Sequence, residues 1–131
     1  MASYVIFGAS RGLGAAFSVG LPRRGDNLWL VSRTAPDLVD RDGVRRRWIE
    51  ADLSMSGAGA TVAKAIKGRR LDAVIYNAGI WERHAFRKSY DFGQVDDAET
   101  ERIIAVNLTS AITCVQKLLP NLRKAKNPKV I

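Results

Sequence analysis

A glycine-rich stretch, Gly8-Ala9-Ser10-Arg11-Gly12-Leu13-Gly14, directly follows the short apolar run Tyr4-Val5-Ile6-Phe7. The apolar run is β-branched and aromatic, so it predicts a buried strand. The glycines allow a tight turn and let the following helix lie close to that strand. The helix would then present free backbone N–H groups and the positive end of its dipole, which suit a pyrophosphate. The alternative is that these glycines form only a structural turn.

The rest of the chain alternates apolar runs with helical patterns. Pro22 predicts that the first helix ends near Leu21. The apolar face predicted for this helix consists of Leu13, Ala16, Phe17, Gly20 and Leu21. Further strands are expected at 28–31, 44–51, 71–76 and 128–131, and a helix at 58–67. A longer helix begins near residue 97, with apolar positions Ile104, Leu108, Ala111, Val115, Leu118 and Leu122. Strand–helix–strand units require parallel crossovers, so the sequence predicts one α/β domain over residues 1–131.

The spacing of the glycines, Gly-x-x-x-Gly-x-Gly, resembles the short-chain dehydrogenase/reductase family. Tyr76-Asn77-Ala78-Gly79 and Val106-Asn107-Leu108 strengthen the resemblance, which covers the chain from Ser3 to its last residue. It implies a Rossmann-type, doubly wound parallel sheet of order 3-2-1-4-5 that is truncated at the fifth strand. It also implies a nicotinamide dinucleotide and hydride transfer between a small-molecule carbonyl and the corresponding alcohol.

Ser32-Arg33, at the end of the second predicted strand, bears on the type of cofactor. NAD-binding proteins place an acidic residue here for the ribose 2′-hydroxyl, and an acid would repel a 2′-phosphate. Arg33 and Arg11 instead offer cations that pair well with phosphate. We therefore expect NADP rather than NAD, the alternative being that both arginines only face solvent.

The resemblance assigns cofactor contacts to two further stretches. It implies that Asp52 meets the adenine amino group and that Leu53 packs on the ring, whereas a structural alternative has Asp52 or Ser54 capping the next helix. Ala78 and Gly79 would allow close approach of a cofactor ribose. Asn77 would tie adjacent strands together through its side-chain amide. The cofactor-binding prediction comprises Gly8, Ser10, Arg11, Gly12, Leu13, Gly14, Arg33, Asp52, Leu53, Asn77, Ala78 and Gly79.

Asn107 matches the asparagine of the family's catalytic tetrad, which helps to hold a water in the proton relay. Its alternative role is to bond a backbone carbonyl. The family's carbonyl-binding serine and its tyrosine–lysine pair follow the fifth strand, so we expect the isolated chain to be inactive. A non-catalytic NADP(H)-binding sensor or interaction module is the alternative function. An unpaired fifth strand and an open sheet face also predict a homo-oligomer or a second chain that completes the fold.

The net charge of +8 raises the alternative of a basic structural or nucleic-acid-associated domain. Its densest cluster, Arg41, Arg45, Arg46 and Arg47, lies just before and within a predicted strand. No aromatic residues interleave with these arginines, which argues against nucleic-acid binding. We interpret them as a solvated outer edge of the sheet.

Other features predict a cytoplasmic protein with no membrane contact. The sequence has no apolar run judged long enough for a bilayer and no leader pattern at its start. Its single cysteine, Cys114, is expected to be a small buried residue. His84 has no partners at metal-ligand spacing and is expected at the surface, so no metal site is predicted. Residues 80–95 predict an aromatic loop at a substrate entrance, in which Tyr90 lacks the family's lysine four residues later.

Overall fold

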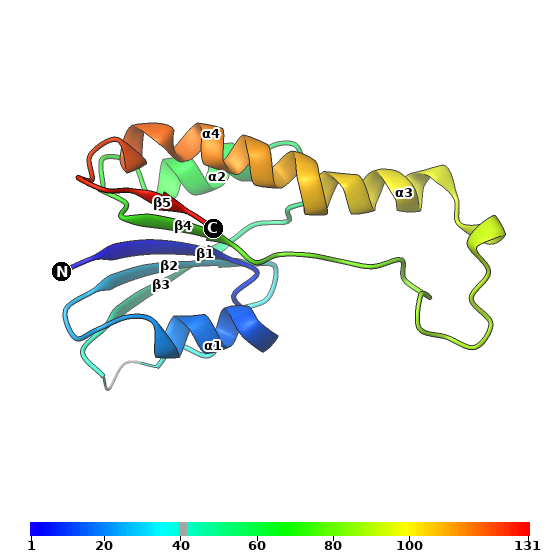
Figure 1. Ribbon diagram of the computed structural model, residues 1–131, viewed down its shortest axis with the longest axis horizontal. Coiled ribbons are helices and arrows are strands. Elements are labelled where there is room, and N and C mark those ends of the chain that lie inside the picture. Colours follow the sequence, from blue (N-terminus) through cyan, green and yellow to red (C-terminus); the bar gives the residue numbers. More distant parts are fainter. Residues whose placement is uncertain (40–41) are drawn as a thin grey trace.

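The computed structural model describes residues 1–39 and 42–131 and is built around a five-stranded parallel sheet (Figure 1). The strand order is β3-β2-β1-β4-β5, which confirms the predicted Rossmann-type order. The strands are β1 (Ser3–Phe7), β2 (Asn27–Ser32), β3 (Arg45–Glu50), β4 (Ala73–Tyr76) and β5 (Lys129–Val130). All pairings are parallel, so the carboxyl ends of β1, β2 and β4 meet at one edge.

Strand β1 lies at the centre and pairs with β2 on one side and β4 on the other, with Val5 opposite Trp29 and Val74. Its side chains alternate between the two faces of the sheet. Val5 and Phe7 belong to the larger core cluster, whereas Ile6 belongs to the smaller one. All three are at most 1% exposed, as expected for a strand that is covered on both faces.

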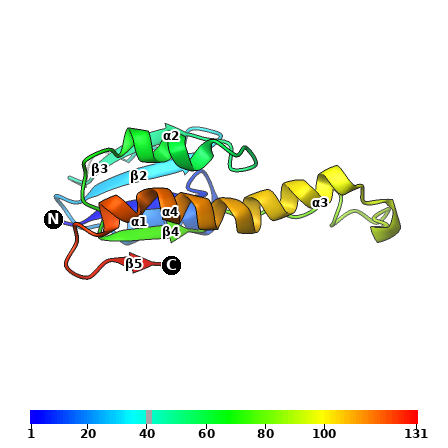
Figure 2. The ribbon, with the colours of Figure 1, turned by 90° about the horizontal axis from the view of Figure 1, so that it is seen from above.

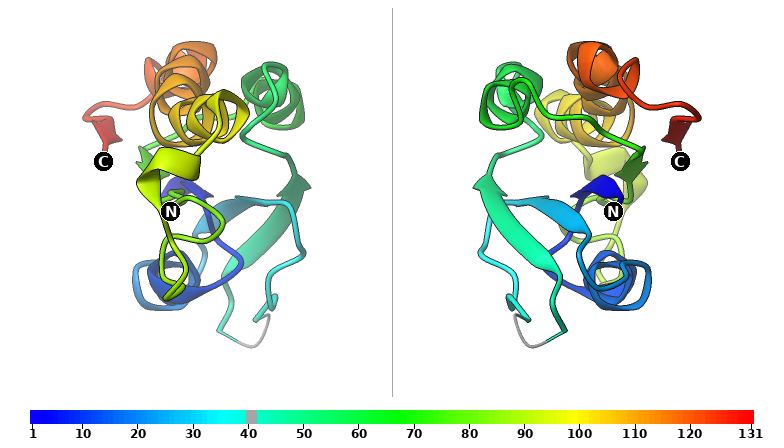
Figure 3. Two further views of the ribbon diagram at one scale, coloured as in Figure 1. Left: turned by 90° about the vertical axis from the view of Figure 1, so that its right-hand side faces the viewer. Right: turned by 90° about the vertical axis from the view of Figure 1, so that its left-hand side faces the viewer.

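Helices cover the two faces of the sheet unequally (Figure 3). Helix α1 (Gly12–Gly20) covers one face alone. The other face carries α2 (Ala58–Ala65) and a long helix formed by α3 (Asp97–Ile104), the π-helical turn η2 (Ala105–Thr109) and α4 (Ser110–Leu122). Figure 2 shows α2 and α4 side by side over the sheet, while α3 extends beyond its edge.

Helix α1 ends where the sequence predicts, but the predicted face is wrong. Four of its five expected members are exposed, namely Leu13, Ala16, Gly20 and Leu21. Gly14 and Ser18 are buried instead, and Phe17 packs against the smaller core cluster. The physical reason is that Gly14 of α1 lies against Gly8, directly after β1, and this contact fixes which side of the helix faces the sheet.

The long helix also departs from its predicted stripe. Ile104 and Leu108 are exposed by 49% and 56%, and the buried residues are Val106, Ser110, Cys114, Leu118, Asn121 and Leu122. The turn η2 widens the helix and shifts the face that meets the sheet, so one helical period does not describe the whole segment. Cys114 is buried and unpaired, which confirms its predicted place.

The expectation that no segment is long and apolar enough to cross a bilayer is wrong for the helix Asp97–Leu122. Its most apolar 18-residue window has a mean hydropathy of 1.4, so by length and composition alone it could span one. In the structure Cys114 and Leu118 of this helix pack into the larger core cluster. Core helices of sheet proteins satisfy the same criterion, so the helix is weak support for a membrane role.

Strand β3 lies at the outer edge of the sheet, as predicted, and Arg45 and Arg47 are exposed there. Arg46 contradicts the interpretation of a solvated edge, because its side chain is only 1% exposed. Its guanidinium donates to the carbonyl oxygens of Val39 at 2.6 Å and Ser18 at 2.8 Å, and pairs with Asp42 at 2.6 Å. Arg46 therefore connects β3 to α1 and to the preceding loop. Arg41, the remaining member of the cluster, lies outside the described residues.

We predict that Arg46→Ala lowers the free energy of unfolding by about 2 kcal/mol, because two backbone carbonyls lose a charged donor. Arg47→Ala is the matched control on the same strand, and its effect should stay below about 0.5 kcal/mol. Urea denaturation of both variants measures the difference. Equal losses of unfolding free energy in the two variants would show that the Arg46 hydrogen bonds and ion pair do not stabilise the fold.

Candidate functional site

A cleft of about 310 Å³ lies at the carboxyl ends of β1, β2 and β4. The direction in which the chain adds strands to the sheet reverses here, because β2 and β3 lie on one side of β1 whereas β4 and β5 lie on the other. Ligands of open α/β sheets bind at such switch points. All predicted cofactor residues except Gly14 line this cleft, namely Gly8, Ser10, Arg11, Gly12, Leu13, Arg33, Asp52, Leu53, Asn77, Ala78 and Gly79.

Gly8 and Gly14 allow the backbone segments around the cleft to touch. Gly8 has a φ of +79°, and a Cβ there would lie 2.8 Å from the Cα of Ala78. A Cβ on Gly14 would lie 2.1 Å from the carbonyl oxygen of Gly8. Gly14 therefore serves the packing of α1 on β1 rather than the cleft wall. At Gly12 the added atom would meet nothing within 4 Å, which leaves open space in front of the loop.

The N-terminus of α1 opens into this cleft. Arg11 occupies the N-cap position without a side-chain capping bond, and the first turn holds no acidic residue. The first backbone N–H groups of a helix have no intrahelical acceptor, and the dipole favours an anion beside them. Arg11 and Arg33 are both exposed and line the cleft, so they add positive charge to it. This end of the cleft has the chemistry of a phosphate site.

Asp52 stabilises a turn and does not cap α2. Its Oδ1 accepts hydrogen bonds from the Ser54 hydroxyl at 2.7 Å and the Ser54 backbone N–H at 2.9 Å. These bonds, with smaller contributions from Arg33 and Arg102, lower the pKa of the Asp52 carboxyl. The N-cap of α2 is Gly57, with no side-chain cap, so the capping alternative for Asp52 or Ser54 is wrong. Leu53 lies in the core with one edge on the cleft.

Asn77 connects β1 and β4 through its backbone. Its N–H donates to the carbonyl oxygen of Phe7 at 3.1 Å. Its side-chain nitrogen lies against Gly14, 3.0 Å from where a Cβ would stand. The resemblance implies a cross-strand tie through the Asn77 amide, whereas in the structure the main chain of Asn77 makes this tie and the amide lies at the junction of α1 and β4.

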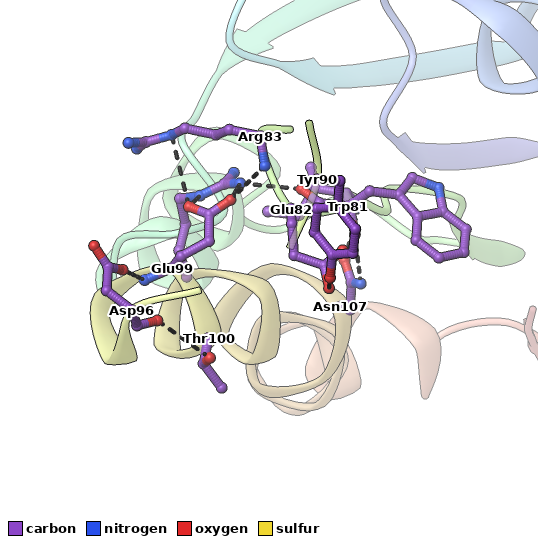
Figure 4. Close-up of polar contacts among 10 residues, drawn as sticks. Trp81, Glu82, Arg83, Tyr90, Asp96, Glu99, Thr100 and Asn107 are labelled. Atoms are coloured by element: carbon purple, nitrogen blue, oxygen red, sulfur yellow. Dashed lines mark hydrogen bonds and ion pairs between the residues drawn. The ribbon is translucent and has the colours of Figure 1, made fainter. Parts of the chain in front are cut away.

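Three side chains of the long helix hold the segment that leaves β4 (Figure 4). Asn107 accepts from the N–H of Ile80 at 2.8 Å and donates to its carbonyl oxygen at 2.9 Å. Arg102 donates to the Trp81 carbonyl oxygen, and Glu99 accepts from the Arg83 N–H. The Asn107 amide therefore has the backbone-bonding role considered as its alternative, while its catalytic role stays a prediction. Asn107 itself does not line the cleft, although Ile80 and Val106 do.

Arg102 also lines the cleft, although it was not among the predicted cofactor residues. Its guanidinium forms a bidentate pair with Glu99, at 2.7 and 3.0 Å. This pair, with help from Arg83, lowers the pKa of the Glu99 carboxyl to about 2. The spacing of the two residues, three apart at a helix start, was the available signal. The period of a helix could not reveal that this side of α3 faces the cleft.

A second hollow, of about 480 Å³, lies among residues 82–99. This segment extends away from the sheet (Figure 1). Tyr90 lines the hollow and donates to Glu82 at 3.1 Å. Burial and the Glu82 carboxylate raise the pKa of the Tyr90 phenol. His84 is exposed there, as predicted. Within residues 1–39 and 42–131 no group of three histidine, cysteine or acidic side chains comes together to suit a metal ion.

Comparison with known proteins gives consistent matches over nearly the whole chain. The model of the short chain dehydrogenase family matches residues 3–131. The rhamnolipids biosynthesis 3-oxoacyl-[acyl-carrier-protein] reductase of Pseudomonas aeruginosa is 31% identical over 95% of this chain and 50% of its own length. The chain spans about half the length of such relatives.

Two solved structures show the same architecture. A short-chain dehydrogenase from Sphingobium yanoikuyae in complex with NADPH superposes with a TM-score of 0.79 and 27% identity, over 99% of this chain and 52% of that one. An NADH-dependent reductase of alginate metabolism, A1-R′, gives a TM-score of 0.82 at 22% identity, over 98% of this chain and 56% of that one. The fold is therefore shared by a dehydrogenase in complex with NADPH and by an NADH-dependent reductase.

We predict that Gly14→Ala destabilises the chain by about 3 kcal/mol, because the new methyl group meets the Gly8 carbonyl and α1 must move away from β1. Gly20→Ala is the control, since an added Cβ at that helix position meets nothing within 4 Å. It should change the free energy of unfolding by less than about 1 kcal/mol. Chemical denaturation of both variants measures this, and similar values would contradict the contact.

We predict that Glu99→Gln removes part of the pH dependence of stability. Because the folded-state pKa is about 2 and the ordinary value is 4.5, ionised Glu99 stabilises the fold fully above about pH 4.5. This contribution is lost as the pH falls toward 2. The difference in unfolding free energy between wild type and variant should therefore be largest at neutral pH and shrink over this window. Glu101→Gln, at an exposed position of α3, is the control, and a difference that grows in acid would contradict the pairing.

Proposed function

Because the chain belongs to the short-chain dehydrogenase family, we propose that it forms the NADP(H)-binding part of an oxidoreductase acting on a carbonyl/alcohol pair. The observation that carries this proposal is the cleft at the switch point of the sheet. It combines an uncapped helix N-terminus with two exposed arginines, Arg11 and Arg33. This arrangement suits the phosphates of a dinucleotide, which supplies or accepts the hydride when it is bound.

Different residues around the cleft would bind different parts of the dinucleotide. The N–H groups at the start of α1 would hold the pyrophosphate, and Gly12 leaves room for it. The Asp52 carboxylate, kept ionised by Ser54, would accept a hydrogen bond from the adenine amino group beside Leu53. Ala78 and Gly79 would let a ribose approach the backbone after β4.

The preference for NADP over NAD rests on the side chains and not on the fold. Arg33 follows β2 directly, where an NAD-binding protein has an acidic residue, and Arg11 lines the same cleft. Two guanidinium groups pair favourably with a 2′-phosphate. The Sphingobium yanoikuyae enzyme is a complex with NADPH, which agrees with this proposal, whereas A1-R′ is NADH-dependent.

Proton delivery to the substrate belongs to the completed fold in this proposal. The resemblance places the serine and the tyrosine–lysine pair after the fifth strand, beyond Ile131. Val130 and Ile131 are exposed by 54% and 69%, so this edge is open to more chain, to a partner chain or to a second copy. We expect no turnover of aldehydes or ketones by the 131-residue chain alone.

A non-catalytic NADP(H)-binding module is the second candidate. It is favoured by the grouping of the predicted cofactor residues in one cleft, which suits binding of a dinucleotide whether or not a reaction follows. A cytoplasmic location without membrane contact is part of either proposal. The packing of Cys114 and Leu118 into the core supports a long helix that lies on the sheet and not in a membrane.

The first test is Arg33→Asp, measured by calorimetry with NADPH and with NADH. We predict that NADPH affinity falls by about tenfold or more, because a charge-assisted hydrogen bond is worth ~1.5–3 kcal/mol. NADH affinity should be retained. Arg47→Asp, with the same charge change on the outer strand β3, should leave both affinities unchanged.

Two results would contradict the proposal. Equal loss of both cofactors would remove Arg33 as the determinant of cofactor choice. Absence of binding of either cofactor to the folded wild-type chain would remove the nucleotide site. Turnover of an aldehyde or ketone by the purified chain would instead show that residues within 1–131 suffice for proton delivery.

A further inference from the structure

Tyr76 ends β4 directly before the predicted cofactor residues and has a contact that their roles do not explain. Its hydroxyl donates to the carbonyl oxygen of Val106 at 2.5 Å. Its ring packs against Phe7, with the ring centroids 5.2 Å apart. Tyr76 does not line the cleft, so it cannot act on a ligand there directly.

The carbonyl that Tyr76 binds belongs to the π-helical turn η2. Within this turn the Ser110 N–H bonds to Ala105, five residues back, in place of the usual four. Such wide turns occur mostly as single turns inside α-helices, often at functional sites. In a regular helix the Ser110 N–H would bond to the Val106 carbonyl oxygen, four residues back. The wide turn directs that N–H to Ala105 instead, and the Tyr76 hydroxyl donates to the Val106 oxygen, which favours the wide turn over a regular helix.

The turn η2 fixes two walls of the cleft. It places Val106 on the cleft surface, and Asn107 next to Val106 binds both backbone groups of Ile80, another lining residue. On the other side of the turn Ser110 and Cys114 point into the core. A regular helix here would turn Asn107 away from Ile80 or Cys114 away from the core.

We propose that Tyr76 is a positioning residue for the cofactor cleft, whose hydroxyl stabilises the π-helical turn and thereby holds Val106 and Asn107 in place. Its link to the cofactor rests on the function proposed above. Burial raises the pKa of the Tyr76 phenol, so the hydroxyl keeps its proton and remains the donor at neutral pH. The competing interpretation is a core aromatic residue in which only the ring matters.

Tyr76→Phe separates these two roles, because it keeps the ring and removes the hydroxyl. The first readout is amide hydrogen exchange of Ile80, whose N–H is bonded to Asn107. We expect exchange at Ile80 to be about tenfold faster, as for loss of one supporting hydrogen bond. The Asn77 N–H, bonded within the sheet, should keep its protection and serves as the internal reference.

Tyr90→Phe is the matched control. It removes a hydroxyl that donates to Glu82 in the other hollow, outside the cleft. It should leave exchange at Ile80 and NADPH affinity unchanged. Tyr76→Phe should weaken NADPH binding several-fold, in calorimetry of the full 131-residue chain.

A double-mutant cycle with Asn107→Ala tests whether Tyr76 acts through Asn107. If it does, Tyr76→Phe should change Ile80 exchange and NADPH affinity much less in the Asn107→Ala background than in the wild type. If the effects of the two substitutions simply add, Tyr76 does not act through Asn107. Unchanged exchange at Ile80 in Tyr76→Phe would overturn the proposal as a whole. Loss of the folded circular dichroism spectrum in Tyr76→Phe would also overturn it, because a local role requires an intact sheet.

Failure of the positioning role of Tyr76 gives a different result from failure of the proposed NADP(H)-binding function. If the wild-type chain binds no NADPH, the cofactor assignment fails, and the exchange data alone decide the role of the hydroxyl. If NADPH binds and Tyr76→Phe changes neither readout, the cofactor assignment stands and the positioning role fails.

Discussion

The close contact between the end of β1 and the start of α1 is the constraint on which the other features of the site depend. The Cα of Gly14 lies so near the carbonyl oxygen of Gly8 that no side chain fits between them. Only this approach brings the helix N-terminus over the point where the order of the strands reverses. Gly8 in turn touches Ala78, so the same turn joins β1, α1 and β4 around one cleft. Removing either glycine would separate the phosphate end of the cleft from its ribose end.

The opposite wall of the cleft depends on side chains and not on sheet pairing. The chain leaves β4 as an extended segment without a neighbouring strand, and its backbone groups still need partners. Asn107, Arg102 and Glu99 supply them from one side of the long helix. The Glu99–Arg102 pair lies between the two hollows, with Glu99 lining the larger one and Arg102 lining the cleft. Disturbance of this helix would therefore reach the cleft through the segment that it holds.

Features encoded by local pattern could be predicted from the sequence, and features that depend on contacts between distant segments could not. The apolar run before Gly8 and the strand-like runs at Leu28 and Val74 gave the strand order once the family resemblance was known. Arg46 looked like a solvated charge, because its carbonyl partners at Ser18 and Val39 are distant in sequence. The π-helical turn breaks the helical period, so Ile104 and Leu108 were wrongly placed in the core. The position of Arg102 at the cleft could not be predicted, because its contact with the Trp81 carbonyl oxygen joins segments that are distant in sequence.

The apolar face wrongly predicted for α1 has a physical meaning of its own. One face of the sheet is covered by α2 and α4, whereas among the described helices α1 alone covers the other (Figure 3). Leu21, directly after α1, is exposed by 48%. Apolar residues at helical spacing are typical of a helix face that packs against another part of the protein. The described residues provide a partner for only one side of α1. The proposed completion of the fold would remove this imbalance, because a further layer beside α1 would cover Ala16, Gly20 and Leu21 while Leu13 stays at the cleft.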